Sequence, residues 1–261
     1  MSDFRQSRPH RPSRRPPLSV FPTTLWQYPS QHYDASDGSR QQGSKHYAGA
    51  TPSWVIWQLL NRYTRPGDVV IDPMCGSGTT LDVCTDLDRQ GVGFDLAPSR
   101  DDITPADARN LPQQSASADF VFVDPPYSTH IKYSDDPECI GKLSAGGEDG
   151  GKAYYDSMER VIAEIDRILK PRRYMALYVS DSWQKRKGKA SNRSAILGGT
   201  FMPIGFELFT RLRTHFEPVD IISVVRQNDK ITRGNWRKAA IEGNFFLRGF
   251  NYCFIMKKGG S

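Results

Sequence analysis

The sequence predicts an α/β fold with a mostly parallel, doubly wound sheet. Short apolar runs alternate with segments of helical periodicity along most of the 261 residues. Several of these runs stop at an aspartate followed by a turn, which is typical of strands that carry a ligand site at their carboxyl ends. The chain is long enough for one such domain with a sizeable core, or for two small ones.

The first expected elements lie between residues 51 and 98. Thr51 can cap a helix and Pro52 suits its first turn, while Pro66 and Gly67 end it. A buried strand over 68–73 then enters a glycine turn over 74–80. A helix over 80–90 and a second strand over 91–98 complete a β-α-β unit.

The remaining elements continue the alternation. A weak third strand precedes a turn over 106–112, and an apolar run over 118–127 is the fourth strand. The segment over 154–171 has the strongest helical repeat. The last expected elements are a strand over 173–183, a helix over 201–216 and strands over 217–227 and 251–258.

The amino-terminal part differs in composition from the rest. Residues 1–20 are rich in arginine and proline, which predicts a disordered basic tail that is either a phosphate-binding arm or a solvated leader. Residues 21–50 are rich in turn residues and are expected to wrap over the domain outside its sheet. We therefore expect a single domain over 21–258.

Charge and cysteine content bound the class of protein. A net charge of +6 favours a polyanionic partner. The four cysteines show neither a CxxC pair nor zinc-ligand spacing, so we expect no metal and reduced thiols. With no membrane-length apolar run and no secretory signal, we expect no membrane partner and a cytoplasmic location.

The glycine turn after the first strand indicates a cofactor site. Asp72 ends the strand, and Gly76 and Gly78 lead into the helix, whose first amides face any bound ligand. Neither the GxxxxGK[ST] nor the GxGxxG pattern is present. An acid beside such a turn suits a ligand that also carries positive charge, and S-adenosylmethionine has this property.

Two more acids stand at later strand ends. Asp95 can accept hydrogen bonds from ribose hydroxyls, and Asp107 from an adenine amine. The tetrad Asp124-Pro125-Pro126-Tyr127 then ends the fourth strand. The Asp124 carboxylate and the Pro125 carbonyl could grip an exocyclic base amine, and Tyr127 offers a ring on which a base can stack.

The combination of "DPMCGSGTT" with "DPPY" about fifty residues later resembles the S-adenosylmethionine-dependent DNA amino-methyltransferases, which methylate adenine N6 or cytosine N4. "HYAGATPSW" is similar to the segment that closes over the methionine end of the cofactor. The resemblance implies a Rossmann-like, seven-stranded sheet. It also implies a cofactor site of Tyr47, Ala48, Thr51, Asp72, Pro73, Cys75, Gly76, Ser77, Gly78, Thr79, Thr80, Asp95, Leu96, Asp107 and Ala108.

The chain departs from many family members because little sequence is left for a separate target-recognition domain. The loops over 135–153, 184–199 and 228–248 are the candidate target contacts. The expected nucleic-acid-binding residues are His130, Lys132, Lys230, Arg233, Trp236 and Arg237. His130 is not needed as a general base, and Ser180 and Asp181 either line the target pocket or cap their strand.

The resemblance favours methylation of adenine N6 in DNA, because aspartate opens the tetrad. Cytosine N4 and an RNA base amine are the alternatives. A catalytically silent nucleic-acid-binding subunit ranks lower, because both motifs are intact, and protein glutamine methylation is a further outside case. A homodimer, a partner subunit and an association with a nuclease, as in restriction-modification, all stay open.

Overall fold

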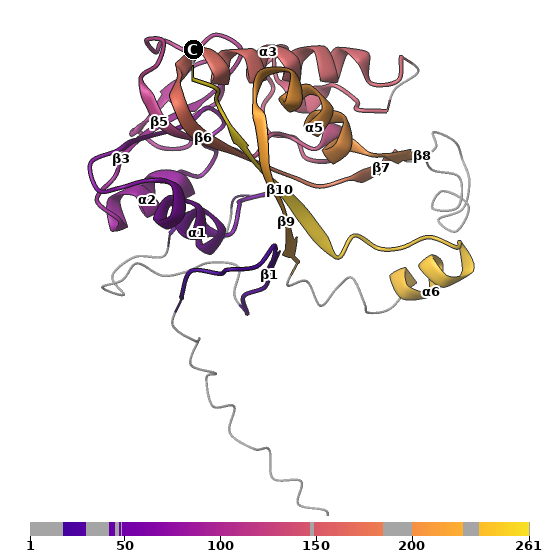
Figure 1. The fold of residues 1–261 in the computed structure, drawn as a ribbon. Coiled ribbons are helices and arrows are strands. Elements are labelled where there is room, and N and C mark those ends of the chain that lie inside the picture. The colour runs from indigo at the N-terminus through magenta and orange to yellow at the C-terminus, as the bar shows by residue number, and fades with distance from the viewer. Residues whose placement is uncertain are drawn as a thin grey trace, which may run out of the picture.

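The computed structural model describes residues 18–29, 42–44, 47, 49–146, 149–184, 200–226 and 235–260. It confirms the expected fold class (Figure 1). The strands of the main sheet are β1 (Leu25–Trp26), β2 (Val69–Asp72), β3 (Gln90–Asp95), β4 (Ile103–Pro105), β5 (Ala118–Val123), β6 (Leu169–Val179), β9 (Glu217–Val225) and β10 (Phe250–Lys257). The helices are α1 (Ser53–Tyr63), α2 (Thr79–Asp86), α3 (Lys152–Ile168), α5 (Ile204–His215) and α6 (Asn235–Glu242).

The strand order places a switch point at β2. The sheet runs β1-β9-β10-β6-β5-β2-β3-β4, and β2 through β6 pair in parallel. Only β10 is antiparallel to its two neighbours, β6 and β9. Because the chain moves outward in both directions from β2, a crevice opens beyond the carboxyl ends of β2 and β5.

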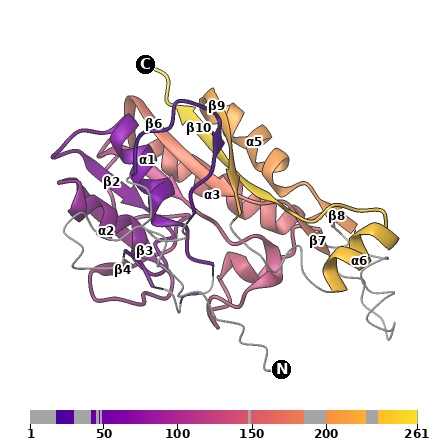
Figure 2. The ribbon, with the colours of Figure 1, turned by 90° about the horizontal axis from the view of Figure 1, so that it is seen from below.

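Helices cover both faces of the sheet, with α1 and α2 on one side and α3 and α5 on the other (Figures 1 and 2). Strand β5 shows the division, because alternate side chains point to opposite faces. Phe120 and Phe122 pack in the cluster with α1, whereas Val121 and Val123 pack in the cluster with α3 and α5. All four are buried, which explains why the run is continuously apolar.

The expectation for residues 21–50 was wrong at one point. Leu25 and Trp26 pair in parallel with Ser223 and Val224, so the sheet has eight strands rather than seven. Trp26 is buried and its ring lies 6.5 Å from that of Trp54 on α1. Aromatic packing therefore holds this segment against the edge of β9, and the turn-rich sequence with its interspersed aromatics did not reveal the pairing.

Helix α1 begins one residue later than expected and is capped differently. Pro52 occupies the N-cap position and no side chain caps the helix. The Thr51 hydroxyl instead donates a hydrogen bond to Asp124, 2.5 Å away. The predicted capping role of Thr51 is therefore wrong.

Helix α3 ends at Ile168, three residues before the predicted limit. Leu169 has an extended backbone and already pairs with Ala118 of β5. The reason is Pro171, since the residue before a proline is pushed out of the helical region. The long β6 therefore follows α3 without a loop.

The expected loops are only partly loops. A short helical turn, η2 (Ile140–Lys142), and the start of α3 lie within 135–153, and α6 lies within 228–248. Strands β7 (Ser182–Gln184) and β8 (Thr200–Met202) form a hairpin, and residues 185–199 lie outside the described part. No described helix is both long and apolar enough to cross a membrane.

Candidate active site

The carboxyl ends of β2, β3 and β5 open on one cavity, which has a volume of about 110 Å³. The turns after β2 and β4 and the segment before α1 complete its walls. Of the predicted cofactor residues, the structure brings together Tyr47, Thr51, Asp72, Pro73, Cys75, Gly76, Ser77, Thr79, Thr80, Asp95, Leu96, Asp107 and Ala108. Gly78 does not line the cavity, and Ala48 lies outside the described residues.

Asp72 is the most deeply placed acid of the cavity. One carboxylate oxygen accepts from the Met74 amide at 3.0 Å and the other from the Thr80 hydroxyl at 2.5 Å. Burial nevertheless raises the pKa of Asp72 to about 7, although both hydrogen bonds lower it. A cationic ligand at this position would restore the ionised form.

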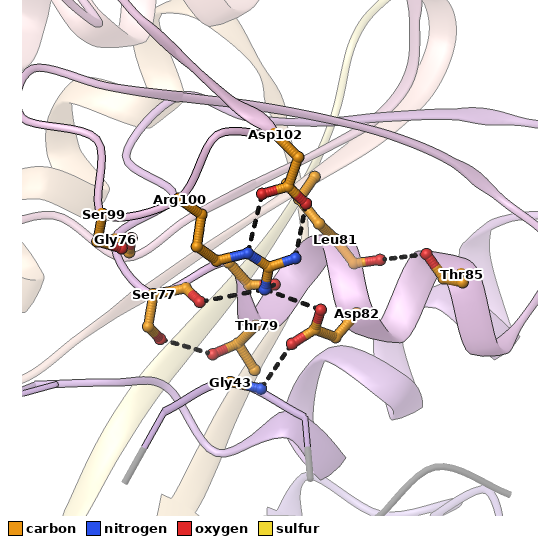
Figure 3. Close-up of polar contacts among 11 residues, drawn as sticks. Gly43, Gly76, Ser77, Thr79, Leu81, Asp82, Thr85, Ser99, Arg100 and Asp102 are labelled. Carbon is orange, nitrogen blue, oxygen red and sulfur yellow. Dashed lines mark hydrogen bonds and ion pairs between the residues drawn. The ribbon is translucent and has the colours of Figure 1, made fainter. Parts of the chain in front are cut away.

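An arginine on the outer side holds the glycine turn in shape (Figure 3). Arg100 donates to the carbonyls of Ser77 and Gly78 at 3.3 and 3.4 Å. Its guanidinium is fixed by Asp82 at 2.8 Å and Asp102 at 2.6 Å. Because these carbonyls point outward to Arg100, the conformation of the turn is fixed before any ligand arrives.

Gly78 itself faces this arginine. A Cβ atom there would lie 2.4 Å from the Arg100 guanidinium, and φ is +79°. The residue therefore belongs to the outer support of the turn and not to the cavity wall.

Asp95, at the end of β3, ties its own turn to the glycine turn. Its carboxylate accepts from the Gly76 amide at 2.9 Å and from the Ala97 amide at 2.9 Å. The side chain lines the cavity, so it can still accept from a ligand hydroxyl through its other lone pairs.

Asp107 differs from its expected role, because its carboxylate is engaged by the protein. Arg109 contacts both of its oxygens, at 2.9 and 2.6 Å, and also reaches Glu138 at 2.9 Å. Burial would raise the pKa of Asp107, but the hydrogen bonds and charge of Arg109 outweigh it and hold the pKa below its ordinary value. Asp107 is therefore a poorer acceptor for an adenine amine than its position suggested.

Asp124 stands on the other side of the cavity, directly after β5. Its two oxygens accept from the hydroxyls of Thr51 at 2.5 Å and Tyr127 at 2.6 Å. Burial raises its pKa to about 7, against the effect of both hydroxyls. The carboxylate is thus held in one orientation from two sides while it lines the cavity.

Hydrogen bonds to the backbone also hold the tetrad in place. The Pro126 carbonyl accepts from the Tyr154 hydroxyl at 2.7 Å and from the Ser128 amide at 3.1 Å. Among the described residues, no hydrogen bond ends on the Pro125 carbonyl. The Tyr127 ring packs against the core on the α3 side, so in this structure its hydroxyl serves Asp124.

The charged side chains of the described cavity lining are all acidic. Its described lining holds five carboxylates, on Asp72, Asp95, Asp107, Asp124 and Glu138, and no lysine, arginine or histidine. Arg109 compensates Asp107 and Glu138 from outside the cavity. The remaining acids favour a ligand with net positive charge and disfavour a phosphate-rich cofactor.

Sequence reasoning missed one wall of the cavity. Tyr133, Ser134, Glu138, Cys139 and Ile140 line it from the loop after the tetrad. The glycine content of that stretch suggested an open loop, but Ser128 and Lys142 fold it back through bonds to Ala145 and Asp135. The closeness of this loop to "DPPY" in sequence was the available signal.

The predicted nucleic-acid-binding residues do not form one surface in the described part of the chain. His130 contacts Ser182 of the β7–β8 hairpin, and Lys132 pairs with Asp135 in solvent. Arg237 is exposed on α6. Lys230, Arg233 and the side chain of Trp236 lie outside the described residues.

Of the two residues that follow β6, Asp181 bonds to the first turn of α5. Asp181 accepts from the Gly205 amide at 3.0 Å and from the Tyr252 hydroxyl at 3.1 Å. Ser180 is buried and bonds to the Asp181 carbonyl. This favours strand-end capping over a place in the target pocket.

The fold and this cavity together define a Rossmann-like protein with a cation-accepting site at the switch point. A family model described as DNA methylase, N6_N4_Mtase, matches residues 3–104. The Type II methyltransferase M.Cfr9I of Citrobacter freundii is 44% identical over 64 residues, which are 23% of this chain and 21% of that protein. M.HpaI of Haemophilus parainfluenzae, also a Type II methyltransferase, is 29% identical over 75 residues, 29% of this chain and 22% of that protein.

The family model and the two relatives support the recognition made from the two motifs, the model over residues 3–104 of this chain. S-adenosylmethionine is the cofactor of that family, as the motifs predicted. The chain matches about a fifth of the length of the two relatives. A solved SAM-dependent methyltransferase of Methanosarcina mazei superposes with a TM-score of 0.46 at 14% identity, covering 78% of this chain and 98% of that one.

Proposed function

We propose that this chain methylates the exocyclic amine of a DNA base with S-adenosylmethionine as methyl donor. One observation carries the proposal: two hydroxyls orient Asp124 in the wall of a cavity whose charged side chains, among the described residues, are all acidic. The reaction needs a cation site next to an acceptor for an amine, and these two features stand side by side here.

The residues around the cavity fit the donor in chemistry. Asp72 and Asp124 are carboxylates whose pKa values are raised by burial, so both gain from a positive ligand. Asp95 offers acceptors for ribose hydroxyls, and Tyr47 places its ring against the Gly76 backbone, where a Cβ atom would lie 3.0 Å from that ring. When bound, S-adenosylmethionine supplies an activated methyl group on its sulfonium.

The chain would act on the amine by orientation. The Asp124 carboxylate and the Pro125 carbonyl can each accept one N–H, which localises the nitrogen lone pair toward the methyl carbon. As the nitrogen–carbon bond forms, the sulfur–carbon bond breaks, and the amine later loses one proton to Asp124 or to water. No covalent intermediate with the protein is needed.

The choice of base rests on family resemblance. Aspartate at the first position of the tetrad leads us to propose adenine N6, with cytosine N4 as the alternative. RNA is the alternative polymer, since similar tetrads serve RNA amines. The net charge of +6 supports a polyanionic substrate of either kind.

The test is methyl transfer from labelled S-adenosylmethionine to duplex DNA, single-stranded DNA and bulk RNA, followed by mass spectrometry of the nucleosides. We expect N6-methyldeoxyadenosine. N4-methyldeoxycytidine would change the base, and label in RNA alone would change the polymer. An absence of label in all three, with cofactor bound, would contradict the proposal.

The matched variants are Asp124→Ala and Asp220→Ala. Asp124→Ala should lower the turnover by about 10³-fold or more, since it removes an acceptor on which the transition state depends, and it should still bind cofactor. Asp220 is exposed on β9, so its variant should behave as wild type. Equal rates for Asp124→Ala and wild type would remove the tetrad from the mechanism.

A further inference from the structure

Four polar residues form a row across the sheet beside the candidate active site. They stand where the strands reach the carboxyl edge of β5: Asp124 after β5, Tyr178 on β6, Asn251 on β10 and Arg226 after β9. These strands are direct neighbours in the order β5-β6-β10-β9. The row therefore leads outward from the tetrad, away from the cofactor cavity.

All four side chains belong to the same face of the sheet. In a strand, residues two positions apart point to the same face of the sheet, so each side chain shares the face of a neighbour two positions away. Those residues are Phe122, Ala176, Cys253 and Val224, and all four pack in the cluster with α1. Thr51, which precedes α1, bonds to Asp124, so the row continues the face on which the catalytic carboxylate is held.

The outer three members are linked by hydrogen bonds. The Asn251 amide donates to the Tyr178 hydroxyl at 2.5 Å, and its carbonyl oxygen accepts from Arg226 Nε at 2.6 Å. Tyr178 and Asn251 are buried, while Arg226 is half-buried. The Arg226 backbone is fixed as well, since its amide donates to the Gly249 carbonyl at 2.9 Å.

The Arg226 guanidinium acts on the candidate active site, and no described carboxylate forms an ion pair with it. Among ion pairs between described residues, Arg100, Arg109, Arg167, Arg173 and Arg211 each pair with a carboxylate, and Arg226 does not. Burial raises the pKa of Asp124, Tyr127 and Tyr178, and the Arg226 charge opposes this rise. Asn251 holds the Nε of Arg226, and within the described part of the chain no partner is seen for its outer nitrogens. A guanidinium held in this way has the geometry that binds phosphate.

The spacing suits a nucleotide. Three steps between neighbouring strands, at about 4.8 Å each, separate the backbone of Arg226 from that of Asp124 by about 14 Å. The arginine side chain shortens this gap. A base whose amine contacts Asp124 would then carry its own phosphate toward Arg226.

We propose that Arg226, positioned by Asn251 and Tyr178, binds a backbone phosphate of the nucleotide whose base enters the tetrad. This inference rests on the proposed function and assigns the phosphate contact that the sequence had placed in the loops. The contact orients the target strand and takes no part in the transfer step.

The test uses the full chain with the variants Arg226→Gln and Arg226→Lys. Arg213→Gln is the matched control, because Arg213 is exposed on α5 on the opposite face and loses the same charge. The probe is a fluorescent single-stranded DNA pool of random sequence, bound in the presence of S-adenosylhomocysteine at several salt concentrations. Cofactor affinity and thermal unfolding are measured for each variant.

We expect Arg226→Gln to weaken binding about tenfold and to reduce the salt slope by about 0.7, the value for one lost contact on a single strand. Arg226→Lys should keep the wild-type salt dependence of DNA binding and recover part of the DNA affinity. Lysine keeps the positive charge but lacks the planar guanidinium that can donate two parallel hydrogen bonds. KM for DNA should rise at unchanged kcat. Arg213→Gln and the cofactor affinities should match wild type.

Several results would overturn the inference. A salt slope for Arg226→Gln equal to that of Arg213→Gln would mean that no phosphate contact was lost. A fall in kcat with an unchanged slope would mean that Arg226 acts on Asp124 and not on the substrate. If Arg226→Gln does not fold, an Arg226→Lys variant with the affinity of wild type would contradict the predicted loss of the fork. Failure of the wild type to bind or methylate any nucleic acid would instead remove the proposed function itself.

Discussion

Thr51 and Asp124 lie 73 positions apart in the sequence and share a hydrogen bond of 2.5 Å. Thr51 precedes α1 and lines the cofactor cavity, while Asp124 ends β5. The bond therefore connects the cofactor side of the site with the tetrad. Tyr127 holds the second oxygen of Asp124, so each hydroxyl fixes one side of the carboxylate.

Replacing Thr51 by valine should lower kcat by about 10- to 100-fold, because a hydrogen bond to a charged group contributes about 1.5–3 kcal/mol. Thr51→Ser keeps the hydroxyl and should stay within a few-fold of wild type. Single-turnover kinetics with saturating cofactor measure the effect. A Thr51→Val enzyme with normal kcat and only weaker cofactor binding would show that Thr51 serves the cofactor alone.

Cofactor affinity should rise with pH up to about 7. In the ligand-free protein, burial raises the pKa of Asp72 and of Asp124 to about 7, and a cation binds the ionised forms. Each carboxyl that must lose its proton adds up to about tenfold in affinity per pH unit below that pKa. Calorimetric titration from about pH 5.5 to about pH 7 checks this, and Asp72→Asn should flatten the profile. A wild-type affinity independent of pH would contradict the raised pKa values.

The stability of the ligand-free protein should change in the opposite direction. The folded-state pKa values of both carboxyls lie above the ordinary aspartate value of 3.8, so the folded chain holds these protons more tightly than the unfolded chain. Their contribution is fully present below about pH 4 and is lost as the pH rises through about 7. Denaturant unfolding with and without S-adenosylhomocysteine measures it. Asp72→Asn should remove the part due to Asp72, and an unchanged slope in that variant would count against the assignment.

Arg109→Gln should destabilise the protein and weaken cofactor binding. Arg109 is only 7% exposed and joins Asp107 to Glu138, which lie on two walls of the cavity. Leaving these acids without their partner should cost about 2 kcal/mol, less than a fully buried pair because both acids are partly solvated. Chemical denaturation and cofactor titration check both effects.

Lys152→Gln is the control for Arg109→Gln. Lys152 and its partner Asp156 are 72% and 59% exposed on α3, so the loss of that pair should leave the stability close to that of wild type. If Arg109→Gln also changes stability by so little, then the loop over 133–140 is not held by this pair.

The sequence predicted the elements that local patterning encodes, and it failed where a distant residue decides the structure. The continuous apolar run before Asp124 announced a strand buried on both faces, and the structure buries it between α1 and α3. The pairing of Trp26 with β9 depends on packing against Trp54 on α1, which no local pattern shows. In the site, Asp107 illustrates the same limit. Its place at a strand end was readable, but its engagement by Arg109 depends on side-chain geometry.

Gly76 should tolerate alanine far less well than Gly67. Both have positive φ, +52° and +85°, which costs a non-glycine residue about 1–3 kcal/mol. A Cβ atom at Gly76 would also lie 3.0 Å from the Tyr47 ring, whereas nothing lies within 4 Å of one at Gly67. Gly76→Ala should therefore displace Tyr47 from the cavity and weaken cofactor binding about tenfold or more, the size of a lost aromatic contact with its area burial.

Gly67→Ala is the control, because it has only the backbone cost. Its unfolding midpoint should fall while its cofactor affinity stays at the wild-type value. Titration of both variants with S-adenosylhomocysteine, next to their thermal unfolding, separates the two effects. Equal cofactor affinities in the two variants would mean that the Tyr47 ring, despite its place against the glycine turn, contributes nothing to the bound cofactor.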